Sequence, residues 1–252
     1  MCSKIYGMSC VPIYHPNKRH LVTQIAKSGV KALLSQSNKK VYNIVLTGGT
    51  SGSELADCLV KYLNKRRNMY FLKKSELHFW LSDERFVDKN SNKRNECVVL
   101  NSLKHLSKKY QVFFHAMISL ENCSISDARN LYEKELEITL ASDIFDLVIL
   151  SLSSDGHLAS IFNISQTSNF LTGRVEITQN PLIESPLRLS LSLSQLAQTR
   201  MLIILAYLEN SHLKKRRFFN DPSSVVTRLI QLASIQNSKS SILIYTNEEE
   251  EI

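Results

Sequence analysis

Three short polar segments, each directly after an apolar run, hold the residues of this chain that could do chemistry. They are residues 47–52 (TGGTSG), residues 82–85 (SDER) and residues 154–157 (SDGH). The first offers glycine-rich backbone, the second two carboxylates and a guanidinium, and the third a carboxylate beside an imidazole. Together these groups suit metal-free acid–base chemistry on a small phosphorylated molecule.

The first segment gathers three of the seven glycines of the chain, Gly48, Gly49 and Gly52, between a strand pattern and a helix pattern. Glycine allows positive φ and close approach of a ligand, and the N-terminus of the following helix favours an anion such as phosphate. Thr50 and Ser51 add hydroxyl donors. The segment lacks the lysine of a P-loop and the G-x-G-x-x-G spacing, so by itself it also fits a plain tight turn.

The other two segments are charged. Asp83, Glu84 and Arg85 follow an apolar strand pattern, and ligands of open α/β sheets bind at the carboxyl ends of the strands. His157 is the one histidine of seven that adjoins an Asp-Gly turn, where Asp155 could orient the imidazole. Considered alone, the SDER segment also fits a surface salt-bridge cluster, and His157 also fits a structural histidine. Considered together, the three segments predict one shared crevice.

Short apolar runs alternate with helical patterns along the chain, which predicts an α/β fold. Because the strand patterns are apolar on both faces, we expect a largely parallel sheet with helices on both faces. The expected strands are 42–46, 77–81, 112–114, 145–152, 187–193, 201–208 and 242–245. The expected helices are 21–34, 53–65, 96–106, 126–140, 212–219 and 224–233.

The composition is that of a globular protein. The chain has 252 residues, of which 43% are hydrophobic and 21% charged, which excludes a disordered chain. It shows neither an internal repeat nor a linker, so we expect a single domain over residues 1–252. Five dispersed cysteines without a C-x-x-C pair argue against a disulfide framework or a zinc site and fit a reducing cytoplasm.

The net charge of +8 favours an anionic partner: a nucleic acid, a membrane surface or a small phosphorylated molecule. Nucleic acid is disfavoured because the basic run at 214–217 carries no recognisable binding motif. A membrane span is disfavoured because the longest apolar run, 201–208, is far below the roughly 18 residues required. No targeting segment is recognisable at the N-terminus. A small phosphorylated molecule is the expected partner.

Several of these motifs resemble those of 6-phosphogluconolactonases, within the wider glucosamine-6-phosphate isomerase/deaminase-like superfamily. The resemblance rests on the segments FWLSDERFV, Ser91-Asn92, FDLVILSLSSDGHLASIF, the Gly-Gly-Thr-Ser loop, PLRLS at 186–190 and Pro-Ser-Ser at 222–224. It covers about residues 17–246 and leaves a short N-terminal extension and an acidic C-terminal tail. It implies a Rossmann-like α/β fold.

The resemblance also implies an activity: hydrolysis of 6-phospho-D-glucono-1,5-lactone to 6-phospho-D-gluconate in the oxidative branch of the pentose phosphate pathway. His157 is then the general base on water, and Asp155 orients it. Asp83 and Arg85 line the pocket, where Arg85 holds an anionic oxygen. No metal or other cofactor is implied. The protein is expected to be cytoplasmic, as a monomer or small homo-oligomer.

The same resemblance implies a set of substrate- and phosphate-binding residues. The 6-phosphate lies against the glycine loop, Arg188 is a charged clamp, and the Ser-Asn pair belongs to the same site. The complete set is Gly48, Gly49, Thr50, Ser51, Ser91, Asn92 and Arg188.

The sequence departs from the family pattern at several positions. Ser151 and Ser153 stand where the family has glycines, and serine would be strained there if either position required positive φ. Asp88 replaces a proline, Asn247 replaces an aspartate, and the late Gly-x-x-Lys segment is not recognisable in 209–212. These departures favour one alternative, a weakened or non-enzymatic sugar-phosphate-binding relative.

A second alternative is glucosamine-6-phosphate deaminase/isomerase activity. That branch has the motif D-E-Y where this chain has Asp83-Glu84-Arg85. It also has a glutamate shortly after its D-G-H segment. Residues 158–166 contain no glutamate. The sequence therefore favours the lactonase over the deaminase.

Overall fold

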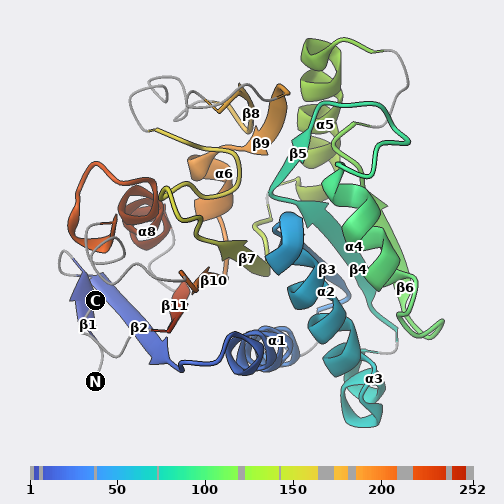
Figure 1. Cartoon of the computed structure of the whole chain (residues 1–252). Helices are drawn as coiled ribbons and strands as arrows, with labels where there is room; N and C mark the ends of the chain where they lie inside the picture. The colour runs from blue at the N-terminus through green and yellow to red at the C-terminus, as the bar shows by residue number, and fades with distance from the viewer. Residues whose placement is uncertain are drawn as a thin grey trace.

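The computed structural model describes residues 3–5, 8–36, 39–72, 74–118, 123–141, 143–163, 173–180, 186–208, 218–236 and 240–247. Their main sheet has the strand order β1-β2-β11-β10-β7-β3-β4-β6 (Figure 1). All neighbours in it are parallel except the antiparallel β1–β2 pair at one edge. The strands are β1 (Ser3–Ile5), β2 (Met8–Tyr14), β3 (Val41–Leu46), β4 (Glu76–Leu81), β6 (Gln111–His115), β7 (Leu147–Ser151), β10 (Met201–Ala206) and β11 (Ser241–Thr246).

A second sheet of three short antiparallel strands has the order β5-β9-β8. These strands are β5 (Asp83–Arg85), β9 (Arg188–Leu191) and β8 (Val175–Thr178). The expected strand 187–193 is therefore only partly right: it lies in this smaller sheet and gives way to a helix at Leu193. The SDER segment contains a strand where we expected only a loop, because three charged residues carry no strand periodicity.

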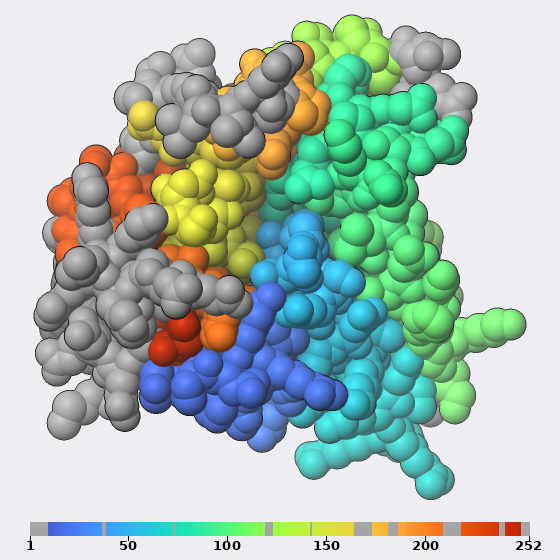
Figure 2. Space-filling view, in the orientation of Figure 1, coloured from blue at the N-terminus to red at the C-terminus, as the bar shows by residue number. Residues whose placement is uncertain are grey.

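The register of the central strands brings the three polar segments together. Leu46 at the end of β3 pairs with Leu81 at the end of β4 and with Ile149 near the end of β7. The chain that leaves each strand therefore emerges at one edge of the sheet. In Figure 2 the yellow segment with the histidine turn adjoins the light-blue start of α2 and the green β5–α4 segment.

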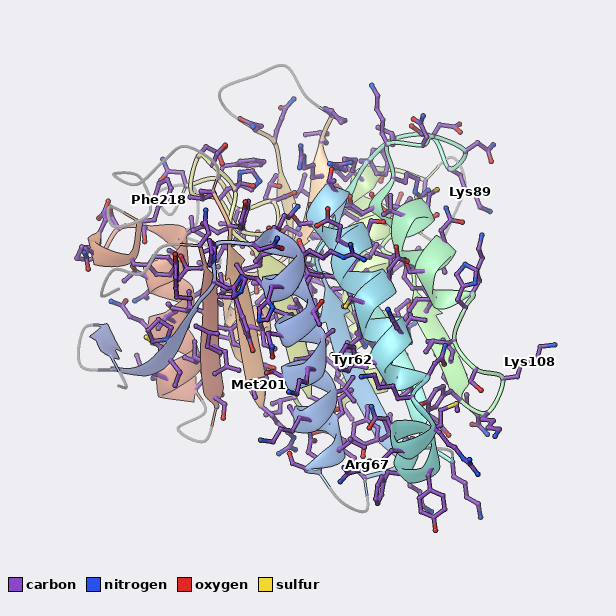
Figure 3. The ribbon with its side chains drawn as sticks, turned by 60° about the horizontal axis from the view of Figure 1, so that its bottom comes forward. Tyr62, Arg67, Lys89, Lys108, Met201 and Phe218 are labelled. Carbon is purple, nitrogen blue, oxygen red and sulfur yellow. The ribbon has the colours of Figure 1, made fainter. Side chains whose placement is uncertain are left out.

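Helices cover the sheet, and α1 and α2 pack side by side in front of it in Figure 3. Among the described residues, none of the helices is long and apolar enough to cross a membrane. Of the expected helix 212–219, residues 212–217 lie outside the described residues. The helices are α1 (Lys18–Leu34), α2 (Gly49–Leu63), α3 (Arg66–Leu72), α4 (Asn95–Leu103), α5 (Ile125–Leu140), α6 (Leu193–Ala197) and α8 (Val225–Gln236).

The core confirms the α/β expectation of a largely parallel sheet. Five consecutive residues of β3, β4 and β10 are buried in each strand, and neighbouring residues of a strand point to opposite faces. Both faces of these strands are therefore covered. Trp80 is fully buried and donates its indole N–H to Asn43 Oδ1 at 3.0 Å, which satisfies the one polar group of the largest side chain in the core.

Candidate functional site

A cavity of about 270 Å³ lies at the carboxyl edge of the sheet and is lined by parts of all three polar segments. This arrangement is the shared crevice that the sequence predicts. Its lining residues are Thr47, Gly48, Gly49, Thr50, Ser51, Asp83, Arg85, Asn95, Ser151, Ser153, His157, Ala159 and Arg188.

The glycine loop forms the start of α2, and two of its glycines are required for different reasons. A Cβ on Gly48 would lie 2.0 Å from Asn95 Cγ, so only glycine leaves room for that side chain. Gly49 has φ +68°, and its N–H donates to Asn95 Oδ1 at 3.1 Å. The next N–H groups, of Thr50 and Ser51, have no acceptor within the helix. They leave α2 with a positive N-terminus at the cavity wall.

The carboxyl group of Glu84 holds this wall in place. It is fully buried and accepts the backbone N–H groups of Arg85 at 2.7 Å, Asn95 at 2.7 Å and Glu96 at 2.8 Å. The N-cap residue of α4, Arg94, makes no side-chain cap, so Glu84 supplies the cap from β5. Burial outweighs these three bonds and raises the pKa of Glu84 to about 7.

The side-chain amide of Asn95 bridges two of the polar segments. Its Oδ1 accepts from Gly49, and its Nδ2 donates to the carbonyl of Asp83 at 2.9 Å. The residue is buried, at 1% exposure. Because Glu84 fixes the Asn95 backbone, the glycine loop and the SDER segment are held in one arrangement.

Asp83 is buried and does not act as a free carboxylate in the cavity. It accepts hydrogen bonds from Ser82 Oγ at 2.9 Å and from Ser160 Oγ at 2.6 Å. Arg188 Nη1 lies 3.3 Å from Ser160 Oγ and 3.9 Å from Asp83 Oδ2. In this arrangement the carboxylate of Asp83 lies between the Ser160 hydroxyl and the guanidinium of Arg188.

Arg85 and Arg188 face each other directly across the β5–β9 pair. Like charges at such cross-strand positions destabilise each other. Burial lowers the pKa of Arg188, and the charge of Arg85 adds to that effect. The Nε–H groups of both side chains are buried and have no partner among the described residues. An anion in the cavity would offset the repulsion between the two guanidinium groups.

The histidine turn places an acid–base pair on the opposite wall. His157 Nδ1 lies 2.6 Å from Asp155 Oδ1, and Ser153 Oγ lies 3.0 Å from His157 Nε2. The hydrogen bond to His157 lowers the pKa of Asp155, so Asp155 is an ionised acceptor at neutral pH. Gly156 has φ +91°, and a Cβ there would meet the Phe218 ring at 2.4 Å.

Ser151, Ser153 and Asn247, which depart from the family pattern, all fit the structure without backbone strain. Strain at Ser151 and Ser153 is not found: among described non-glycine residues only Ala141 and Ala159 have positive φ, and Ala159 lines the cavity. Asn247 joins the ends of β11 and β10 through two 3.3 Å bonds to the Leu208 backbone.

Other sequence expectations fall outside the cavity or outside the described residues. Asp88 accepts the N–H of Asn90 at 2.8 Å within the β5–α4 loop. Ser91 and Asn92 lie in the same loop and do not line the cavity. Residues 209–212 lie outside the described residues. The sequence does not predict a role for Asn95 or Ser160, because each is a single polar residue outside the three polar segments.

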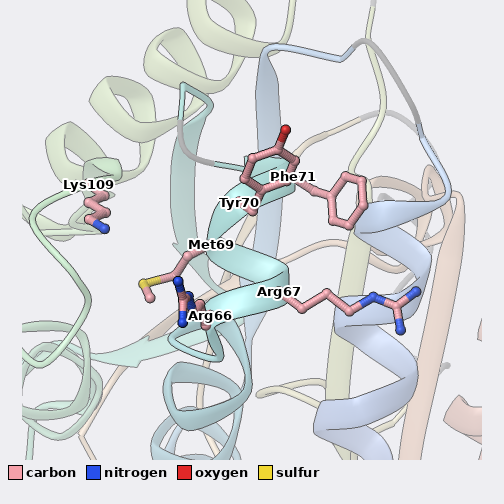
Figure 4. Close-up of a pocket in the computed structure, with 6 residues that line it drawn as sticks. All are labelled: Arg66, Arg67, Met69, Tyr70, Phe71 and Lys109. Atoms are coloured by element: carbon pink, nitrogen blue, oxygen red, sulfur yellow. The ribbon is translucent and has the colours of Figure 1, made fainter.

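A different hollow, of about 660 Å³, lies on and around α3 (Figure 4). It has basic and apolar walls and none of the three polar segments contributes to it, so we place the chemistry in the smaller cavity. Its lining residues are Arg66, Arg67, Met69, Tyr70, Phe71 and Lys109.

Comparison with known proteins gives a consistent picture. The sequence profile of the family described as glucosamine-6-phosphate isomerases/6-phosphogluconolactonase matches residues 16–228. A 6-phosphogluconolactonase of Haemophilus influenzae is 31% identical over 157 residues, which cover 60% of this chain and 61% of that protein. One of Thermotoga maritima is 36% identical over 100 residues, 38% of this chain and 41% of that protein. The matches thus span less than two thirds of these relatives.

Solved structures share the fold. A 6-phosphogluconolactonase from Trypanosoma brucei superimposes with a TM-score of 0.75 at 20% identity and covers 96% of this chain and 98% of its own. One from Shewanella baltica gives a TM-score of 0.75 at 20% identity, with 94% and 98% covered. The topology, including the largely parallel sheet, is therefore that of these proteins.

Gly48→Ala and Gly49→Ala separate the two reasons for glycine in this loop. We expect Gly49→Ala to lower the free energy of unfolding by about 1–2 kcal/mol, since only positive φ is disturbed. Gly48→Ala should cost more, because its Cβ collides with Asn95 and breaks the bridge to Asp83. Urea unfolding of both variants measures the difference. Equal losses would contradict the role of Asn95.

The carboxyl group of Glu84 should make stability depend on pH. Its folded pKa, about 7, exceeds the ordinary value of 4.5, so the folded state binds more protons between these values. The stabilisation is present below pH 4.5 and is lost as pH rises through 7. Relative to Glu84→Gln, the wild type should lose about 3 kcal/mol between pH 4.5 and 8. Urea unfolding across that range tests this; parallel curves for the two proteins would refute it.

Proposed function

Because the chain belongs to the glucosamine-6-phosphate isomerase/6-phosphogluconolactonase family, we propose that it hydrolyses 6-phospho-D-glucono-1,5-lactone to 6-phospho-D-gluconate. One observation supports this proposal most strongly. His157, whose Nδ1 lies 2.6 Å from Asp155 Oδ1, lines a cavity that Arg85 and Arg188 also line. A base and a cation pair in one cavity suit attack on an anionic ester.

His157 is the general base. An ionised Asp155 can only accept, so His157 Nδ1 carries the proton and Nε2 keeps the lone pair with which it can accept a proton. Nε2 takes a proton from water as its oxygen bonds to C1 of the lactone. The C1–O5 bond then breaks, and His157 returns the proton to O5. A lactone is activated enough that this chemistry requires no metal.

The two arginines bind different negative groups of the substrate. Arg85 stabilises the oxyanion that develops at C1, where a preorganised donor contributes most in the transition state. The 6-phosphate binds at the N-terminus of α2, between the Thr50 and Ser51 N–H groups and Arg188. Phosphate there also reduces the repulsion between Arg85 and Arg188 across the β5–β9 pair.

The lactonase fits the site better than the deaminase. Arg85 lines the cavity where the sibling branch has tyrosine, and the segment after the histidine turn offers no glutamate. The oxidative branch of the pentose phosphate pathway is the proposed setting. The proposed compartment is the cytoplasm, which agrees with free thiols at Cys58 and Cys97.

His157→Ala should lower kcat/KM by about 100- to 10,000-fold, the usual contribution of a general base, and leave the fold intact. The assay couples freshly generated lactone to 6-phosphogluconate oxidation and subtracts the spontaneous rate. His105→Ala is the matched control, because His105 is exposed and does not line the cavity. A wild type that does not accelerate hydrolysis would overturn the proposed function.

Inorganic phosphate and 6-phosphogluconate should raise the melting temperature, because both bind only the folded state. A ligand at ten times its Kd adds about 1.4 kcal/mol. Arg188→Met should remove most of this shift, whereas Arg67→Met, which changes an arginine of the α3 hollow, should keep it. Thermal unfolding at millimolar ligand measures the shift. No shift in the wild type would count against a phosphate site.

A further inference from the structure

Ser153, His157 and Asp155 form a continuous hydrogen-bonded relay within one turn. Ser153 Oγ lies 3.0 Å from His157 Nε2, and His157 Nδ1 lies 2.6 Å from Asp155 Oδ1. A nucleophile bonded to a base that a carboxylate orients is the arrangement of enzymes that form covalent acyl intermediates. The family pattern has glycine at 153, so this hydroxyl is a feature of the present chain.

The direction of the hydrogen bonds follows from the donors available. Asp155 accepts from Nδ1–H, so in neutral His157 the Nε2 atom has no proton. Ser153 must therefore donate its O–H to Nε2. The proton of Ser153 already points at the base that would remove it.

The backbone of the turn fixes this pair. The Ser153 N–H donates to the His157 carbonyl at 3.1 Å, and the Gly156 N–H donates to the Ser153 carbonyl at 3.0 Å. Both Ser153 and His157 line the cavity with Arg85 and Arg188. A water attacking directly would have to donate its O–H to His157 Nε2, and in this chain the Ser153 hydroxyl already occupies that hydrogen-bonding position.

We propose that Ser153 is the nucleophile of this chain and that hydrolysis passes through a 6-phosphogluconoyl ester on its Oγ. This inference rests on the proposed lactonase activity and replaces direct attack by water with attack by Ser153. His157 then acts twice as general base, first on Ser153 and then on water.

The two half-reactions balance without any further reactant. In the first, Ser153 Oγ bonds to C1 while its proton passes to His157 Nε2; the C1–O5 bond then breaks, and O5 takes that proton. In the second, His157 removes a proton from water, the water oxygen bonds to C1, and the bond from C1 to Ser153 Oγ breaks. Ser153 Oγ receives the proton, and the products are 6-phosphogluconate and the original enzyme.

The direct test is rapid acid quenching of wild-type enzyme during turnover, followed by peptide mass spectrometry. We expect one lactone mass on the peptide that contains Ser153, present only while substrate remains and released by hydroxylamine. Lactones also acylate lysine amines without catalysis, but those amides persist after turnover and resist hydroxylamine. An absence of the ester in an enzyme that is turning over would count against the proposal.

Three variants give an independent result. Ser153→Ala and Ser153→Gly should lower kcat by at least about 100-fold and abolish the adduct. Ser154→Ala is the matched control, since Ser154 is exposed in the same turn and does not line the cavity. If Ser153 only fills the place of water, Ser153→Gly will match or exceed the wild-type rate, which overturns the proposal. A wild type without lactonase activity overturns the proposed function instead.

Discussion

The buried carboxyl group of Glu84 binds three backbone N–H groups, and the geometry of the whole cavity depends on that interaction. It joins the end of β5 to the start of α4 and so sets the position of Asn95. Asn95 then fixes the glycine loop on one side and the Asp83 carbonyl on the other. Glu84 thus positions the cavity wall without being among the residues that line the cavity.

The two sheets have different tasks. The parallel sheet sets the common edge, because the paired ends of β3, β4 and β7 release their loops at one level. The small antiparallel sheet brings Arg188, which is distant in sequence, opposite Arg85. The Asp155–His157 pair is built locally, in one turn, whereas the two arginines are brought together through long-range strand pairing. His157 is therefore held by short local bonds, and Arg188 lies beside the buried carboxylate of Asp83.

The sequence predicts the parts of the site that are local in the chain and not those that depend on long-range contacts. The histidine turn and the glycine loop are local patterns, and the apolar runs specify the parallel sheet, so these features are visible along the chain. β5 is too short to show periodicity, and the contacts of Asn95 and Ser160 join residues 46 and 77 positions apart. Ser153 was recognised only as a departure from glycine. Its meaning depends on the 3.0 Å contact with His157, which spacing alone does not reveal.

The facing arginines bear on how the protein behaves among cellular anions. Because Arg85 and Arg188 face each other across the β5–β9 pair, an anion bound beside them reduces the repulsion between their charges. Departure of that anion restores the repulsion, so exchange of one anion for another is favoured over departure alone. Under the proposed function, inorganic phosphate would therefore compete with the lactone for this cavity.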